Sequence, residues 1–187
     1  MNNNNEEVEQ YNGDELSLIY GVAESFLNKG VVGNPPKFVM VVGVVGSGKT
    51  TFRRQKFSEG YVNFESGEIT AAVEKIFGEN NPRLSQYENM IMQIILAASI
   101  REKKNIVIEI IGDSADIITP IINKMKEIGY YVSGNKINCN PEVAYQRHLK
   151  AVENDKDYLS AYFTQEMTLA AFYDELGLGA MPLVDEK

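Results

Sequence analysis

A glycine-rich segment that ends in lysine and threonine carries the clearest chemistry in the sequence. Residues 43–50, GVVGSGKT, complete the pattern G-x-x-x-x-G-K-[ST] directly after a run of apolar residues. Glycines in such a loop let successive backbone N–H groups point at one anion, and the following helix adds its positive dipole end. Lys49 would contact the β- and γ-phosphates of a nucleoside triphosphate, and the Thr50 hydroxyl would hold Mg²⁺. The segment therefore predicts a phosphate-binding loop.

The residues that we expect to contact the nucleotide share this loop and the first helical turn after it. They are Gly43, Val45, Gly46, Ser47, Gly48, Lys49, Thr50 and Thr51. A second segment, GNKIN at 134–138, is faintly similar to the guanine-reading N-K-x-D sequence of GTPases. It ends in Asn138 instead of aspartate and lies in a predicted strand, so we expect ATP, with Mg²⁺, to be the ligand.

Two further segments offer charged side chains that phosphoryl transfer could use. Glu109 lies in the apolar run NIVIEIIGD, where a charge is costly unless it has a partner. We predict that it positions the metal or the acceptor; the alternative is a buried glutamate paired to a backbone amide or a lysine. Arg147 and Lys150 share one face of a predicted helix, and Arg147 could supply an extra cation to the γ-phosphate. The alternative for Arg147 is a surface arginine.

The segment YVNFESGEI, residues 61–69, offers two candidate carboxylates. A phosphotransferase needs a carboxylate that accepts or orients the hydroxyl proton of its acceptor. Glu65 follows the predicted strand immediately and is our first choice, whereas Glu68 suits the first turn of a helix. Both could instead be solvated acids at a helix start. Arg53 and Arg54, after the loop, are interpreted as solvated helix residues, although either could reach a phosphate. The predicted catalytic residues are thus Lys49, Glu65, Glu109 and Arg147.

Strands and helices alternate along the chain. Apolar runs predict strands at 38–42, 61–64 and 106–111 and within 130–139, and helical spacing predicts helices at 14–28, from 49, at 68–77, 84–98 and 117–128, and from 141 to about 176. Asp14 is the expected cap of the first helix. This alternation predicts an α/β fold with a parallel sheet and right-handed crossovers. Ligands of such sheets bind beyond the carboxyl ends of the strands, which is where the candidate residues lie.

Composition and length limit the class of protein. The 187 residues suit a single domain at 13–187, with a disordered tail at 1–12, a helical extension at 13–34, a core at 35–153 and a C-terminal helical segment at 154–187. A net charge of −8 disfavours general nucleic-acid binding. The one cysteine excludes an intrachain disulfide. With neither a secretion signal nor a run of about 18 apolar residues, we expect a soluble, cytoplasmic protein.

Three segments together resemble the zeta-toxin-like P-loop kinases. They are NPPKFVMVVGVVGSGKTTFRRQKF, NIVIEIIGD and MKEIGYYVSGNKINCNPEVAYQRHLKAVE, and their order and spacing agree from about residue 35 to 153. The resemblance implies a three-layer fold of the nucleoside-phosphate-kinase type with strand order 2-3-1-4. It also implies an ATP-dependent kinase. The predicted acidic helix at 14–28 could serve a protein partner or an antitoxin; the alternative is that its apolar stripe packs on the domain. Relatives phosphorylate the 3′-hydroxyl of the sugar in UDP-N-acetylglucosamine, and others in the wider group act on antibiotics, nucleotides or RNA ends.

The acceptor side of the resemblance shows departures. Glu65, Gly67 and Glu68 stand where the family usually has an aspartate, and Ile111 and Asp113 stand where it tends to have a small hydroxyl residue and an arginine. An acid in place of that arginine would repel a diphosphate.

We therefore expect an ATP- and Mg²⁺-dependent phosphotransferase acting on a hydroxyl of a small molecule, with UDP-N-acetylglucosamine as one candidate acceptor. Two alternatives stay open. The protein could be a non-catalytic ATP-binding switch or decayed kinase, or it could be a polynucleotide-end kinase, against which the acidic charge counts.

Overall fold

The computed structural model describes residues 11–112, 115–154 and 161–182. Residues 1–10 of the predicted tail, and Asp113 at the acceptor side, lie outside the described residues. Within the described part, no helix is long and apolar enough to cross a membrane.

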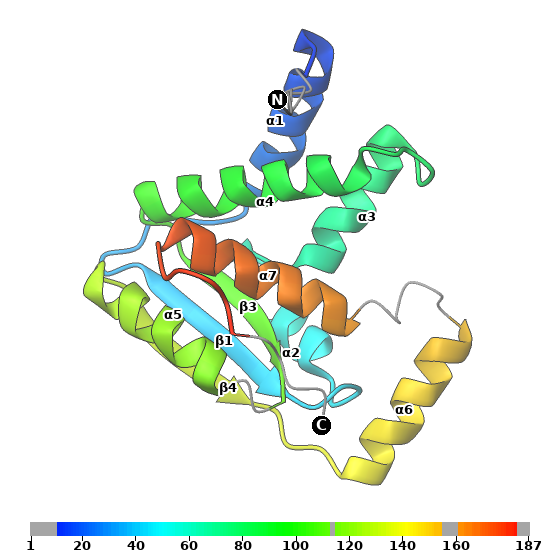
Figure 1. The fold of residues 1–187 in the computed structure, drawn as a ribbon. Coiled ribbons are helices and arrows are strands. Elements are labelled where there is room, and N and C mark those ends of the chain that lie inside the picture. Colours follow the sequence, from blue (N-terminus) through cyan, green and yellow to red (C-terminus); the bar gives the residue numbers. More distant parts are fainter. Residues whose placement is uncertain (1–10, 113–114, 155–160, 183–187) are drawn as a thin grey trace, which may run out of the picture.

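A parallel sheet of four strands forms the centre of the fold (Figure 1). The strands are β1 (Lys37–Gly43), β2 (Val62–Asn63), β3 (Ile106–Ile111) and β4 (Tyr131–Lys136). Their order is β2-β3-β1-β4, and β1 pairs in parallel with both β3 and β4. Both the α/β class and the strand order 2-3-1-4 are thereby confirmed. Because the strands are parallel, their carboxyl ends meet at one edge of the sheet.

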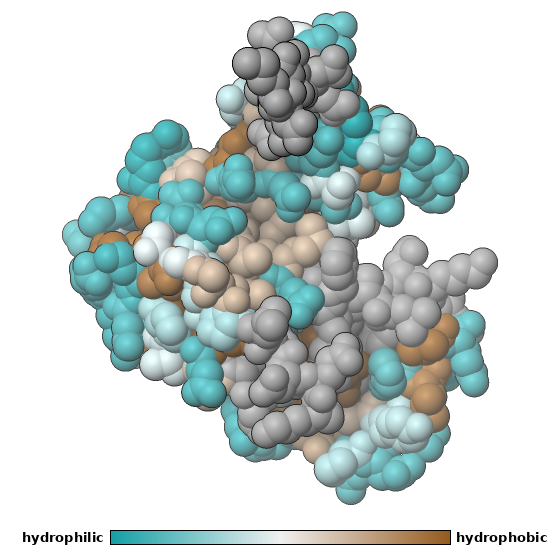
Figure 2. All heavy atoms as spheres, viewed as in Figure 1, coloured by the Kyte–Doolittle hydropathy of each residue, from teal (hydrophilic) through white to brown (hydrophobic). Residues whose placement is uncertain are grey.

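Seven helices connect and cover these strands in the described residues. They are α1 (Gly13–Leu27), α2 (Lys49–Lys56), α3 (Ser66–Phe77), α4 (Leu84–Arg101), α5 (Ala115–Glu127), α6 (Pro141–Asn154) and α7 (Ala161–Glu175). Figure 1 shows α4 and α7 lying across one side of the sheet, and α6 standing at the periphery. Apolar side chains such as Val143 and Leu149 are exposed on α6, where Figure 2 shows hydrophobic atoms at the surface.

The two faces of the sheet are covered by cores of unequal size, and successive side chains of a strand point to opposite faces. Phe38 and Met40 of β1 belong to a large core shared with side chains of α1, α3, α4, α5 and α7. Val39 and Val41 point to the other face, where they join a small cluster that includes Phe52 of α2. The third layer is therefore carried by α2, the helix that begins in the glycine-rich loop.

The C-terminal helix α7 is part of the main core. Its Phe172 is fully buried and its ring lies 5.3 Å from the rings of both Phe38 and Phe64. Thr168 of the same helix donates a hydrogen bond to the Ser66 hydroxyl (3.1 Å), and the Gln165 side chain bonds to the backbone of β3 at Ile111. Helix α7 thus fixes the carboxyl end of β3 and the start of α3.

The beginning of α1 differs from expectation in two respects. Asn12, not Asp14, is the cap: its side chain accepts from the Glu15 backbone N–H, and the Glu15 carboxylate accepts from the Asn12 N–H, each at 2.9 Å. This reciprocal pair satisfies two helix donors at once, which a cap at Asp14 would not. Tyr11 packs against Tyr87, with 6.0 Å between the ring centroids. Tyr11 and Asn12, both within the predicted tail, thus make defined contacts with the rest of the fold.

Candidate active site

The glycine-rich loop connects β1 to α2 at the carboxyl edge of the sheet. Gly46 and Gly48 have φ angles of +76° and +97°, which residues with a Cβ rarely adopt. The Lys49 side chain folds back over the loop, and its Nζ donates to the carbonyls of Gly43 (2.9 Å) and Val44 (3.0 Å). Burial lowers the pKa of Lys49, opposed by the charge of Glu109. The loop is therefore already curled around its lysine.

Helix α6 closes the outer side of this loop. A Cβ built on Gly46 would lie 2.1 Å from the Ala144 carbonyl oxygen and 3.3 Å from the His148 backbone nitrogen. Ala144 is accordingly buried, although most of α6 is exposed. The close contact requires glycine at position 46 and joins the loop to the helix that carries Arg147.

Ser47 adds an observation that bears on a bound anion. Its side chain is buried, and its Oγ has no hydrogen-bond partner in the described part of the chain. Buried hydroxyls normally have partners. A phosphate held by the loop would supply an acceptor for this hydroxyl, so the residues present fit an anionic ligand.

The neighbouring strand β3 brings Glu109 to the loop, as predicted. Glu109 is the register partner of Val41 in β1, and its side chain is 11% exposed. The Thr50 hydroxyl donates to Glu109 Oε2 at 2.9 Å, and Arg53 Nε donates to Glu109 Oε1 at 2.6 Å. A hydroxyl and a carboxylate thus meet beside the phosphate loop, which is a donor set that suits a Mg²⁺ ion sharing its coordination with phosphates and water. No group of three or more His, Cys, Asp or Glu side chains suited to a metal occurs in the described residues.

Arg53 corrects the sequence interpretation. Its side chain is only 4% exposed, so the expectation of a solvated helix residue is wrong, whereas Arg54 is 65% exposed. Arg53 is buried because it lies between two carboxylates, Glu109 and Glu68, which compensate for the loss of hydration. It follows Lys49 by four residues and therefore shares a helix face with it, the one sequence signal that pointed to this position.

Glu68 of α3 is the second partner of Arg53. Its Oε1 accepts from Arg53 Nη2 at 2.7 Å and from Arg54 Nη2 at 3.2 Å, and its Oε2 accepts from Asn63 Nδ2 at 2.5 Å. Burial alone would raise the pKa of Glu68, but the charge of Arg53, with further contacts from both arginines, outweighs it, and the pKa is lowered. Glu68 is thus held as a carboxylate.

Glu65, the preferred candidate base, caps helix α3. Its two carboxylate oxygens accept from the backbone N–H groups of Gly67 (3.1 Å) and Glu68 (3.0 Å). Burial raises the pKa of Glu65; these two hydrogen bonds oppose the rise, and the negative charges of Glu109 and Glu68 add to it. The structure thus gives Glu65 a local structural task at the edge of the site.

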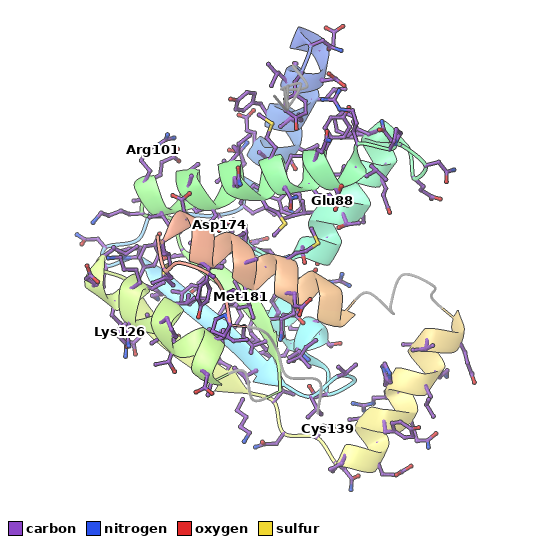
Figure 3. All side chains as sticks on the ribbon, in the orientation of Figure 1. Glu88, Arg101, Lys126, Cys139, Asp174 and Met181 are labelled. Carbon is purple, nitrogen blue, oxygen red and sulfur yellow. The ribbon has the colours of Figure 1, made fainter. Side chains whose placement is uncertain are left out.

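Arg147 lies on the exposed surface of α6. Its Nη1 is 3.8 Å from the Sγ of Cys139, which precedes α6 and is labelled in Figure 3. Its helix touches the loop through Ala144, but no described contact joins the Arg147 guanidinium to the loop. A role for Arg147 at the γ-phosphate stays a prediction.

A comparison with solved structures supports the fold assignment. A chain described in the molecular and structural characterization of the PezAT chromosomal toxin–antitoxin system of the human pathogen Streptococcus pneumoniae is similar to this one, with a TM-score of 0.55. The match covers 89% of this chain and 71% of that chain at 17% sequence identity. No protein-family model matches the sequence, and neither does any curated protein. The similarity therefore concerns the fold alone, a parallel α/β sheet of order β2-β3-β1-β4 with a glycine-rich loop after β1.

Proposed function

We propose that this protein is an ATP- and Mg²⁺-dependent phosphotransferase that acts on a hydroxyl group of a small molecule. The observation that carries the proposal is the meeting of three groups at the carboxyl edge of the sheet. Lys49 is folded into a curled glycine loop, and the Thr50 hydroxyl lies 2.9 Å from the Glu109 carboxylate of the adjacent strand. Phosphoryl transfer depends chiefly on positioning and on neutralising phosphate charge, and these groups supply both.

Each residue has a proposed role in nucleotide binding. The backbone N–H groups of residues 43–51 and the N-terminus of α2 would bind the phosphates, and Lys49 would neutralise charge on the β- and γ-phosphates. Thr50 and Glu109 would hold Mg²⁺, which when bound offsets negative charge on the phosphate oxygens. Arg147 is proposed to add a cation near the γ-phosphate. A carboxylate after β2, Glu65 or Glu68, would receive the proton of the acceptor hydroxyl.

The acceptor and the partners belong to the proposal as well. The resemblance to zeta-toxin-like kinases makes UDP-N-acetylglucosamine the first acceptor to test. The structural neighbour comes from a toxin–antitoxin system, and on that ground we include a protein antitoxin among the proposed partners.

The proposal is tested with purified protein, radiolabelled ATP and Mg²⁺, with water alone and with UDP-N-acetylglucosamine, UMP and a 5′-hydroxyl oligonucleotide. We expect phosphate transfer that Lys49→Ala abolishes. Lys56→Ala is the matched control, because Lys56 is an exposed lysine on the same helix. Undiminished transfer by Lys49→Ala would refute the mechanism. Transfer to the oligonucleotide alone would support a polynucleotide-end kinase instead.

One observation favours a second candidate, a nucleotide-binding switch without transfer. All three carboxylates near the loop are already engaged: Glu65 caps α3, Glu68 pairs with both arginines, and Glu109 pairs with Arg53 and Thr50. ATP binding that depends on Lys49, with no phosphate transfer to any acceptor including water, would establish the switch.

A further inference from the structure

Arg53 connects two carboxylates that come from different elements of the fold. Its Nε bonds to Glu109 at the end of β3, and its Nη2 bonds to Glu68 in the first turn of α3. Glu109 in turn accepts from the Thr50 hydroxyl. An unbroken series of charged or charge-assisted hydrogen bonds therefore runs from the phosphate loop to the segment after β2, with separations of 2.9, 2.6 and 2.7 Å.

The two carboxylates after β2 are held in different ways. Both oxygens of Glu65 accept backbone N–H groups of α3, so its orientation is set by the helix that it caps. Glu68 is held entirely by side chains: Arg53, Arg54 and Asn63. Its side chain is 28% exposed, compared with 11% for Glu109, so solvent and a small acceptor reach it more readily.

Asn63 marks the buried side of Glu68. The residue is 5% exposed, its Nδ2 donates to Glu68 Oε2, and its Oδ1 has no hydrogen-bond partner in the described residues. A carboxylate has about four acceptor positions. Two on Oε1 are used by the arginines and one on Oε2 by Asn63. Within the described ranges of the chain, one position on Oε2 stays open for a donor such as a hydroxyl.

Resting on the proposed phosphotransferase function, we propose that Glu68 is the carboxylate that receives the acceptor proton, and that Arg53 is the positioning residue that fixes Glu68 relative to Glu109. In the transfer step the acceptor oxygen forms a bond to the γ-phosphorus of ATP. The bond from that phosphorus to the β,γ-bridging oxygen breaks, and its electron pair leaves with ADP. The hydroxyl proton passes to Glu68. Glu65 is assigned to stabilising the start of α3.

The test compares Glu68→Gln, Glu65→Gln and the matched control Glu79→Gln, a change at an exposed position just after α3. ADP formation from ATP is measured with water and with UDP-N-acetylglucosamine as acceptors, beside ATP binding by calorimetry and thermal unfolding. For Glu68→Gln we expect kcat to fall by about 100-fold or more, as for loss of a general base, with ATP affinity retained. Its unfolding temperature should fall as well, because the ion pair with Arg53 is lost, so kcat is the readout that separates it from Glu65→Gln. For Glu65→Gln we expect a lower unfolding temperature and a retained kcat.

Arg53→Lys provides a second, independent readout. Lysine cannot form both bonds of the guanidinium, so Glu68 would lose its fixed position. The charge of Arg53 and its hydrogen bond both lower the pKa of Glu68, and lysine keeps the charge but loses that hydrogen bond. The acid limb of the kcat/KM profile should therefore move to higher pH in Arg53→Lys, whereas ATP affinity should be retained. A merely structural arginine would leave that limb in place.

The outcomes separate the inference from the function on which it rests. Full turnover by Glu68→Gln, or loss of kcat confined to Glu65→Gln, would overturn the assignment while leaving a kinase. An unmoved acid limb in an active Arg53→Lys variant would overturn the positioning role. If the wild-type protein forms no ADP from ATP in a reaction that depends on Lys49, the proposed function would be overturned, and the role of Glu68 with it.

Discussion

Replacement of Gly46 by alanine should separate the phosphate loop from helix α6. Gly46 has a φ of +76°, and the new Cβ would lie 2.1 Å from the Ala144 carbonyl oxygen and 3.0 Å from its carbonyl carbon. Both are backbone atoms of α6, so the movement of a flexible side chain cannot relieve the clash. The same loop offers a comparison, because Gly48 has a φ of +97° and a Cβ there would meet nothing within 4 Å.

The magnitude follows from these two geometries. A residue with a Cβ in the left-handed region costs about 1–2 kcal/mol, and this applies to both positions. Overpacking adds about 1–3 kcal/mol at Gly46 only. We therefore expect Gly48→Ala to lower the free energy of unfolding by about 1–2 kcal/mol, and Gly46→Ala by about 2–5 kcal/mol. For a chain of this size, each kcal/mol corresponds to about 2–4 °C in Tm.

Urea unfolding of the two variants, followed by circular dichroism, measures the difference directly. A free energy of unfolding at least about 1 kcal/mol lower for Gly46→Ala than for Gly48→Ala would support the packing of α6 on the loop. Equal losses would refute it, because the backbone conformation would then account for the whole effect. Calorimetry with ATP completes the assay: Gly46→Ala should also bind ATP more weakly, since the displaced loop no longer presents its N–H groups together.

Three further predictions concern single side chains. Glu109→Ala should lower the free energy of unfolding in urea by about 3 kcal/mol, because it removes one partner of buried Arg53. A loss below about 1 kcal/mol, which is typical of surface ion pairs, would contradict this reasoning. Asn105→Ala should lower the free energy of unfolding by about 1–3 kcal/mol, since Asn105 Oδ1 accepts from the Lys37 N–H at 2.9 Å. ATP binding should be unchanged, because Asn105 precedes β3 at the opposite edge of the sheet. Because the folded pKa of Glu68 lies below its usual value of 4.5, its stabilising contribution is present above pH 4.5 and is lost as the pH falls through the folded pKa. Unfolding experiments between neutral and acidic pH should therefore show a smaller decrease for Glu68→Gln than for wild type, and parallel curves would contradict the ion pair with Arg53.

Features encoded by neighbouring residues were predicted from the sequence. Continuous apolar runs predicted the strands, because a strand that is buried on both faces does not alternate polar and apolar residues; β1 is an example. The loop followed from a contiguous pattern whose glycines are required by positive φ angles at Gly46 and Gly48. Glu109 was predicted at the site because parallel strands end at one edge, and it does lie beside Thr50.

Features that depend on distant partners were not predicted. Arg53 is separated by 15 residues from Glu68 and by 56 from Glu109. Its four-residue spacing from Lys49 places it on the same helix face but does not reveal these two partners, so its burial could not be predicted. Glu65 as a helix cap was also missed, since aspartate, asparagine, serine and threonine are the usual caps. The contact between Gly46 and Ala144 joins segments whose approach depends on the whole fold.

The pairing of charges around Arg53 has a consequence for the acceptor. Arg53 and Arg54 face three formal carboxylates, Glu65, Glu68 and Glu109, so the side of the site after β2 has an excess of negative charge. The positive charge of Arg53 is already offset by its two carboxylate partners, Glu68 and Glu109. In the proposed mechanism, positive charge for the γ-phosphate would then come from Lys49, the loop N–H groups, Mg²⁺ and Arg147. An acceptor that brings its own phosphates near Glu68 would be repelled, whereas an uncharged hydroxyl would not. Neutral sugars and alcohols should therefore be better acceptors than nucleotide sugars unless a cation outside this network reaches the diphosphate.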